Sequence, residues 1–244
     1  MKVTLITHTP EPEKVIASAA KLCYGSSDIE TLMNDLTEEK IEKFIKRLTD
    51  LGHESPLEHC TFTFGIEGVS RAMTHQLVRH RIASYSQKSQ RYVTEGQFEY
   101  IIPPEIENIP EAKTLFIKAM ECDQIVYDNL VEILKQRHLQ TIREYEADLK
   151  KAEQSAEKKA IEDARFVLPN ACETKIIMTM NIRTLLHFFE ERCCNRAQWE
   201  IRYMADIMLD ICKDNAPNIF SKAGASCVRG KCKEGKMSCG QPRK

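Results

Sequence analysis

The spacing of apolar residues changes several times along the chain, and each change predicts a different element. Residues 60–67 place an apolar side chain at every second position, which predicts a half-buried strand. Residues 2–7 and 174–181 are short apolar runs, which predict an edge strand and a buried strand. Residues 92–104 predict a further strand or hairpin, stopped by two consecutive prolines.

Helical spacing accounts for most of the remaining chain. The predicted helices cover residues 15–22, 38–51, 73–81, 111–138, 182–192 and 197–211. Thr37 is the expected N-cap of the second helix and Gly52 its C-terminal stop. Residues 139–163 are dense in Lys and Glu, which predicts a solvated helix or the arm of a helical hairpin, with a charged binding tail as the alternative. On the long helix, one apolar row is formed by Leu115, Ala119, Cys122, Val126, Leu130 and Ile133.

The densest group of cationic side chains lies in residues 73–92 and leads into a serine-rich turn. Its members are Arg79, His80, Arg81 and Arg91. If the helix continues to residue 81, Gln76, Arg79 and His80 share one face. The nearest carboxylates in the sequence are Glu67 and Glu95. Arginines without nearby carboxylates favour an anionic ligand, although a solvated basic surface is the alternative.

Composition limits the classes of function. The 244 residues carry a net charge of −1, so the cationic group is a local feature. A nucleic-acid-binding module would show a broader basic surface, and it remains a rival explanation of the arginines. Apolar runs fall short of a membrane span, and the N-terminal run is too short for a signal peptide. We therefore expect a cytoplasmic protein without a membrane partner.

Most of the ten cysteines occur singly within apolar patterns, as at Cys23, Cys60, Cys122 and Cys212, and predict reduced, buried thiols. The loop of residues 52–59 contains two histidines and two glutamates, but their spacing does not match a zinc helix. In the tail, Cys227, Cys232 and Cys239 form a weak zinc signal without a clear fourth ligand. We expect no metal, with a zinc-binding tail as the second rival hypothesis.

Five ordered segments point to a family. The string R-H-R-x7-S runs from Arg79 to Ser89, and it is accompanied by G-H-E-S-P-L-E-H-C-T-F-T-F, F-V-L-P, M-N-I-R-T-L-L-H-F-F and A-Q-W-E-I-R. Together they resemble the flavin-dependent thymidylate synthases over residues 1–220. The resemblance implies an α+β fold with a central β-sheet flanked by long helices. It leaves residues 221–244 as a separate cysteine-containing tail.

The resemblance also implies an activity. Enzymes of this family convert dUMP to dTMP, taking the methylene from 5,10-methylenetetrahydrofolate and a hydride from FADH2, which NADPH regenerates. They are homotetramers whose active sites are built from several subunits. The implied cofactors are thus FAD and NADPH, and the implied partners are dUMP, the folate and further copies of the chain, without nucleic acid.

Site residues follow position by position from the matched segments. The implied FAD-binding residues are His53, Ser55, Glu58, Arg79, His80, Arg81, Asn181, Arg183 and His187. The implied dUMP-binding residues are Gln76, Arg79, Gln87, Ser89, Arg91, Arg165 and Arg192.

The implied catalytic residues are Arg192 and Ser89. A guanidinium at the N3/O4 edge of the uracil stabilises the ionised ring, and this is the expected role of Arg192. Ser89 is expected to position the substrate through its hydroxyl, because no adjacent residue in the sequence would activate it as a nucleophile. Cys193 and Cys194 are interpreted as packing thiols. Ser86, Gln87 and Arg196 depart from the residues common in the family, where Asn, Glu and His occur.

Overall fold

A computed structural model describes residues 1–90 and 97–243. The chain divides into two compact units. The first unit comprises Met1–Glu67, His75–Ser86 and Ile176–Lys244, and the second comprises Gly68–Thr74 and Gln87–Lys175.

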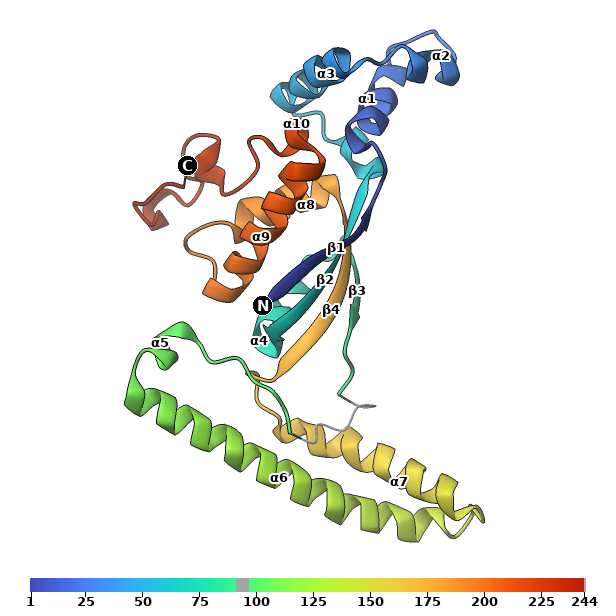
Figure 1. Ribbon diagram of the computed structural model, residues 1–244, viewed down its shortest axis with the longest axis vertical. Helices are drawn as coiled ribbons and strands as arrows, with labels where there is room; N and C mark the ends of the chain where they lie inside the picture. Colours follow the sequence, from blue (N-terminus) through green and yellow to red (C-terminus); the bar gives the residue numbers. More distant parts are fainter. Residues whose placement is uncertain (91–96, 244) are drawn as a thin grey trace. The chain divides into compact units, whose positions relative to one another are not determined.

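The described residues form one four-stranded antiparallel sheet in the order β1-β2-β4-β3 (Figure 1). Its strands are β1 (Lys2–His8), β2 (Thr61–Ser70), β3 (Ser84–Gln87) and β4 (Glu173–Asn181). β1 lies at one edge and pairs with β2 alone, which confirms the edge-strand prediction. β2 alternates buried and partly exposed residues as predicted. β4 was expected to be fully buried, but it alternates in the same way because only one of its faces is covered.

One prediction for the segments beside the sheet was wrong, and a second lies partly outside the described residues. Residues 84–87, expected within a serine-rich turn, form the edge strand β3. Of the segment 92–104, residues 92–96 lie outside the described part of the chain, and within residues 97–103 a single bridge pairs Tyr100 with Cys172. Both segments are polar or interrupted by proline, so their apolar pattern is a poor guide to strand pairing.

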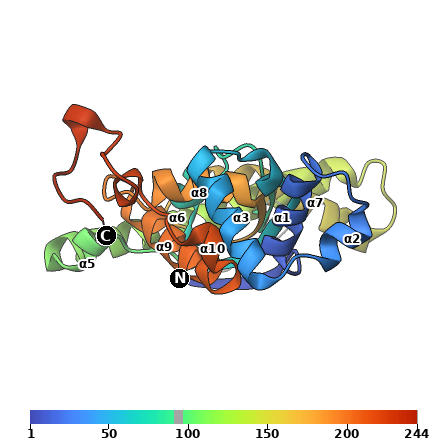
Figure 2. The same ribbon diagram turned by 90° about the horizontal axis from the view of Figure 1, so that it is seen from above.

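The helices of the first unit agree closely with the apolar periodicity. They are α1 (Pro12–Leu22), α2 (Ile29–Asn34), α3 (Glu38–Leu51), α8 (Ile182–Arg192), α9 (Trp199–Asn215) and α10 (Pro217–Phe220). Thr37 caps α3 by accepting a hydrogen bond from the backbone of Lys40, and Gly52 ends the helix at φ 68°, as predicted. The short helices α2 and α10 were missed. α10 packs against α9 and α3 (Figures 1 and 2).

A carboxylate from α1 holds α10 in place. Glu13 Oε1 accepts hydrogen bonds from the backbone N–H groups of Asn218 at 2.7 Å and Ile219 at 3.2 Å. Its second oxygen accepts from the Asn218 side chain at 2.7 Å. The first backbone N–H groups of a helix lack partners within the helix, so this carboxylate satisfies them and brings the residues after α9 back to α1.

The second unit contains α5 (Pro104–Glu107), α6 (Pro110–Ile142) and α7 (Leu149–Ala164). α6 and α7 lie side by side as a helical hairpin, which confirms the predicted arm (Figure 1). Ala152, Ala156 and Ala160 are fully buried on one row of α7. Such small side chains allow close approach of the two helices.

The apolar row predicted for α6 does not face the core of the chain. Leu115 is 71% exposed and Ile133 is 63% exposed. The residues of α6 that are buried instead include Met120 and Tyr127. The hairpin partner occupies a different side of α6 from the row that the periodicity selected.

The helix containing the cationic segment is shorter than predicted. α4 (Arg71–Leu77) ends before Arg79, and the backbone N–H groups of Arg79 and His80 bond three residues back, as in a turn. The Tyr85 hydroxyl reaches the carbonyl oxygens of Leu77 and His80, each at 2.9 Å. Burial raises the pKa of Tyr85 to about 12, so this hydroxyl remains a donor. Gln76, Arg79 and His80 therefore do not share a helical face.

Only some of the cysteines that were predicted to be buried are buried. Cys60 and Cys212 are buried as predicted, whereas Cys23 and Cys122 are exposed. Among residues 1–90 and 97–243, no helix is long and apolar enough to cross a membrane.

Candidate functional site

A cavity of about 680 Å³ lies within the first unit. Its walls come from the 3₁₀ turn η1 (Ser55–His59) and the residue before it, the turn after α4, the helix α8 and one residue of the tail. The lining residues are Glu54, Glu58, Arg79, His80, Arg81, Ile82, Asn181, Arg183, Thr184, Leu186, His187, Glu190, Glu191, Arg192 and Arg229. Eight of the residues implied by the family resemblance thus meet around one cavity, although they come from three separate parts of the sequence.

Asn181 joins strand β4 to the helix at the cavity wall. Its side-chain oxygen accepts a hydrogen bond from the backbone N–H of Thr184 at 2.8 Å, so it is the N-cap of α8. This contact fixes where α8 begins. Arg183 and His187 then lie one turn apart on the exposed side of the helix.

Arg192 is held by a buried histidine. Its Nε–H donates to His80 Nε2 at 2.9 Å, so His80 is the acceptor and its Nε2 carries no proton. His80 is only 7% exposed and packs edge-on against Phe188, with 4.9 Å between ring centroids. Two effects lower the pKa of His80 to about 4: desolvation is the larger, and the positive charge of Arg192 is the second. The imidazole therefore stays neutral at ordinary pH and directs the guanidinium.

This shift predicts a pH dependence of stability. The pKa of His80 falls from 6.5 to about 4 on folding, so the unfolded chain binds the proton more tightly. The stabilisation of the folded state by neutral His80 is fully present above pH 6.5 and is lost as the pH falls towards 4. We expect the free energy of unfolding of the wild type to decrease across this window relative to His80→Gln, whose amide oxygen can still accept from Arg192. Urea denaturation at several pH values measures the difference, and a constant difference would contradict the assignment.

Carboxylates occupy the cavity together with the arginines. Arg183 Nε lies 3.2 Å from Glu54 Oε2, and its Nη1 lies 2.5 Å from Glu58 Oε1. Of the described lining residues, five are arginines and four are glutamates. The expectation of a cationic group without carboxylates nearby was therefore wrong for the folded chain, because η1 and α8 bring glutamates that are distant in sequence.

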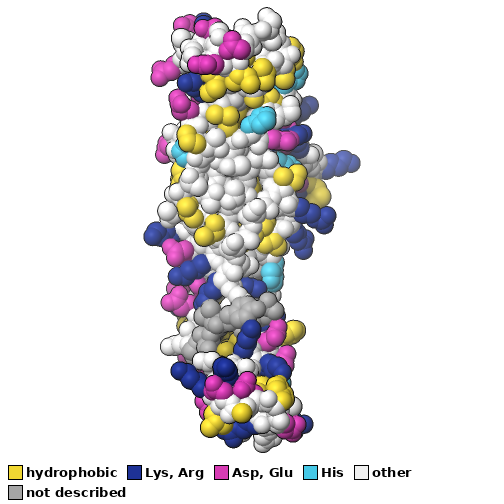
Figure 3. Space-filling view, turned by 90° about the vertical axis from the view of Figure 1, so that its right-hand side faces the viewer, with side chains coloured by type: hydrophobic (Ala, Val, Ile, Leu, Met, Phe, Trp, Pro, Cys, Tyr) yellow, Lys and Arg dark blue, Asp and Glu magenta, His cyan; other side chains and the backbone are white. Residues whose placement is uncertain are grey.

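Arg79 and Arg81 remain available to a ligand. Both are exposed, and neither makes an ion pair with another described residue. Over the face drawn in Figure 3, Lys and Arg side chains are interspersed with Asp and Glu. An anion is thus favoured at the cavity itself.

The tail contributes residues that sequence reasoning did not place at the site. Arg229 lines the cavity and lies 3.4 Å from Glu190, whose other oxygen pairs with Lys233. Glu190 and Glu54 were also missed. No local pattern marks the pairing of Glu190 with Arg229, since the partners are 39 residues apart.

Other predicted residues lie elsewhere. His53 is exposed two residues before η1, Ser55 is exposed at the start of η1, and Gln76 is half-buried in the last turn of α4. None of these three is among the described residues that line the cavity. Arg91 lies outside the described residues.

Gln87, Ser89 and Arg165 belong to the second unit. The Gln87 amide nitrogen donates to the hydroxyl oxygens of Thr74 at 3.0 Å and Thr174 at 3.3 Å, which orients its side chain. Ser89 is half-buried just after β3. Arg165 Nε donates to the carbonyl oxygen of Glu162 at 3.1 Å, and its guanidinium stacks on Phe166.

Comparisons with known proteins identify the class of protein to which this chain belongs. The family model described as thymidylate synthase complementing protein matches residues 4–218. The flavin-dependent thymidylate synthase of Clostridium tetani is 58% identical over 241 residues, covering 99% of this chain and 94% of that protein. That of Geobacter sulfurreducens is 47% identical over 244 residues, again covering 99% and 94%.

A solved structure agrees in fold. It is the flavin-dependent thymidylate synthase ThyX from Helicobacter pylori, complexed with FAD and dUMP, with a TM-score of 0.65 and 21% identity. The match covers 92% of this chain and 100% of that one. This solved structure shares the α+β fold. The family model and the named relatives show that the chain is an enzyme, a transferase that makes dTMP. Within this class, the chain belongs to the flavin-dependent thymidylate synthase family.

Proposed function

We propose that this chain converts dUMP to dTMP with FAD as its bound cofactor, 5,10-methylenetetrahydrofolate as methylene donor and NADPH as reductant. The main observation in support of this proposal is the cavity in which Arg192, His80 and six other residues of the matched segments meet. The relatives are named for the reaction, and the solved structure of similar fold is a complex with FAD and dUMP.

The residues of the cavity suit a flavin dinucleotide. FAD carries a pyrophosphate, and the exposed guanidiniums of Arg79 and Arg81 have no carboxylate partner among the described residues. A volume near 680 Å³ is within the range of about 300–1,000 Å³ for cofactor sites. Bound FAD, once reduced by NADPH, supplies the hydride. The residues proposed to hold it are His53, Ser55, Glu58, Arg79, His80, Arg81, Asn181, Arg183 and His187.

The nucleotide requires a second set of groups. Guanidiniums form charge-assisted bonds to phosphate that are roughly twice as strong as neutral ones. The residues proposed to bind dUMP are Gln76, Arg79, Gln87, Ser89, Arg91, Arg165 and Arg192. Ser89 is assigned the positioning of the substrate through its hydroxyl.

Arg192 is assigned the main electrostatic role. C5 of the uracil must become electron-rich before it can attack the methylene carbon, and negative charge then develops at the N3/O4 edge. A guanidinium placed there stabilises that charge without having to reorganise during the reaction. The hydrogen bond to neutral His80 supports this role, because it fixes the guanidinium through Nε and leaves its terminal nitrogens to donate elsewhere.

The organisation of the protein is part of the same proposal. Residues 1–220 are assigned the synthase activity and residues 221–244 an added tail, in line with a family match that ends at residue 218. A cytoplasmic homotetramer with shared active sites is also proposed. The exposed apolar row of α6, including Leu115 and Ile133, supports association because such rows normally lie against a partner.

A visible absorption spectrum of the purified protein is the first test. We expect a yellow protein with near one flavin per chain, which NADPH bleaches under anaerobic conditions, faster when dUMP is present. Adding 5,10-methylenetetrahydrofolate should then yield dTMP, detected by chromatography. A colourless protein that takes up no added FAD would overturn the proposal.

A further inference from the structure

Four thiols gather at one small cavity beside the tail. It is lined by Cys194, which follows α8, and by Cys227, Cys232 and Cys239 of the tail. Its volume is about 20 Å³, enough for one water molecule or one ion. The tail sequence supplies three of these thiols, and only folding brings Cys194 beside them.

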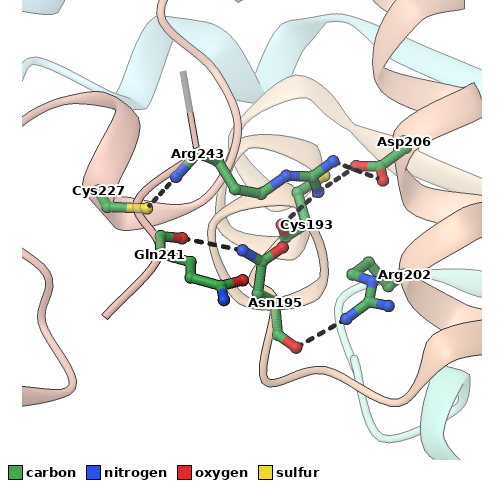
Figure 4. Close-up of polar contacts among 7 residues, drawn as sticks. All are labelled: Cys193, Asn195, Arg202, Asp206, Cys227, Gln241 and Arg243. Carbon is green, nitrogen blue, oxygen red and sulfur yellow. Dashed lines mark hydrogen bonds and ion pairs between the residues drawn. The ribbon is translucent and has the colours of Figure 1, made fainter. Parts of the chain in front are cut away.

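The tail is fastened to the turn that carries Cys194. The Arg243 guanidinium binds both carboxylate oxygens of Asp206, at 2.6 and 2.8 Å (Figure 4). Asn195 Nδ2 donates to the carbonyl oxygen of Gln241 at 2.9 Å, and Arg196 donates to that of Met237. Residues 195 and 196 therefore bind the tail on both sides of Cys239 in sequence, and this holds the tail thiols near Cys194.

Two of the sulfur atoms already accept backbone hydrogen bonds. The Gln241 N–H donates to Cys239 Sγ at 3.4 Å. The Arg243 N–H donates to Cys227 Sγ at 3.3 Å (Figure 4). Gly240, between the first pair, has φ 71°, a left-handed conformation that lets the chain turn back towards the sulfur. Hydrogen bonds to ligand atoms of this kind orient metal-bound thiolates and stabilise their charge.

We propose that Cys194, Cys227, Cys232 and Cys239 bind one Zn²⁺ in a tetrahedral site. Four sulfur ligands in a tetrahedron are typical of structural zinc. Glu234 also lines the cavity but is paired with Arg196 at 3.3 Å, so the thiols are the available ligands. On binding, the thiols release their protons to solvent.

Binding requires the thiols to move inward. Among the described residues, no group of three or more His, Cys, Asp or Glu side chains is arranged to hold a metal ion as it stands. The tail can adjust, because it consists of the short turns η3 (Ser226–Val228) and η4 (Gly235–Met237) and of loops with glycine at positions 230, 235 and 240. A segment with so few apolar residues gains more of its order from a metal than from a core.

The site would fix a wall of the functional cavity. Arg229, which lines that cavity, lies between the ligands Cys227 and Cys232 in sequence. Zinc would therefore restrain Arg229 and its ion pair with Glu190. The proposal does not depend on the reaction that the cavity carries out.

Metal analysis of the full chain tests the site. We expect one zinc per chain after purification under reducing conditions, or after incubation with Zn²⁺ and removal of the excess with a weak chelator. Replacement by Co²⁺ should give absorption bands typical of tetrahedral thiolate, in the red region where flavin does not absorb. Serine at any of the four positions should weaken zinc binding by at least about tenfold. Cys23→Ser, at an exposed cysteine remote in sequence, is the matched control and should retain zinc.

Several results would overturn the proposal. Wild-type protein that takes up neither Zn²⁺ nor Co²⁺, while all four thiols react with a thiol reagent, would exclude the site. A disulfide between two of the four would exclude it as well, and iron with acid-labile sulfide would contradict zinc. If Cys194→Ser were the one variant that still bound zinc normally, the assignment of Cys194 as the fourth ligand would be wrong. The cobalt spectrum of the wild type decides the matter even if a variant folds poorly.

Discussion

Replacement of Arg192 by alanine is expected to lower the rate of dTMP formation by roughly 10²–10³-fold, equivalent to about 3–4 kcal/mol of transition-state stabilisation. The variant loses the guanidinium that we propose faces the developing charge on the uracil ring. It also leaves His80 Nε2 without the donor that lies 2.9 Å away. Steady-state kinetics with saturating dUMP and folate measures the change in kcat.

Two further variants isolate the cause. Arg192→Lys retains the charge but loses the planar fork and the Nε donor, so we expect an intermediate loss. Arg47→Ala removes an exposed arginine from α3 and should leave kcat unchanged. Flavin content should be the same in all three variants, whereas Arg192→Ala should unfold at a lower temperature because the buried His80 Nε2 loses its donor. An unaltered kcat in Arg192→Ala, with flavin bound, would rule out the catalytic role.

The largest effect on stability is expected for Phe62→Ala, which should reduce the free energy of unfolding by about 3–5 kcal/mol. Phe62 is 0% exposed in β2 and stacks on His8 with 5.2 Å between ring centroids. It also meets Phe220 edge-on at 6.0 Å. Its removal leaves a cavity where the sheet, α10 and the N-terminal strand come together.

Urea denaturation followed by circular dichroism measures this loss. Tyr24→Ala is the control, because Tyr24 is an aromatic residue of the same unit but is 77% exposed. Its effect should stay within about 0.5 kcal/mol. Equal losses in the two variants would mean that the ring of Phe62 does not contribute through burial.

Local sequence patterns predicted an element correctly where the residues that determine it are neighbours in the sequence. The alternation in residues 60–67 predicted β2, and the Thr37 and Gly52 signals marked both ends of α3. α8 also agreed with its predicted span, because Asn181 caps its first turn. In each case the atoms that decide the structure lie within a few residues of one another.

Contacts between distant residues explain the failures. The end of α4 depends on the hydroxyl of Tyr85, and His80 is drawn inward against Phe188 from α8. β3 has the polar sequence Ser-Tyr-Ser-Gln, and it becomes a strand only because β4 offers its edge. Cys194 meets the tail thiols only after folding.

Only part of the candidate site was predicted, because some of its residues meet through contacts between distant parts of the chain. The arginines and histidine of the R-H-R segment could be named from sequence, and they do line the cavity. Glu54 and Glu190 could not, since their pairing with arginines depends on how η1, α8 and the tail meet. The balance of charge in a cavity is a property of the folded chain, whereas the identity of its strongest donors is a property of the sequence.

The antiparallel sheet has a consequence for biosynthesis. β2 ends at Ser70 and its neighbour β4 begins at Glu173, so about 100 residues separate their appearance from the ribosome. At about 5–20 residues per second, β2 waits roughly 5–20 s with β1 as its only sheet neighbour. The α6–α7 hairpin, whose contacts are close in sequence, forms within that interval. The nascent chain therefore holds a two-stranded ribbon with an open edge until β4 is made, and this is the stage at which chaperones would protect it.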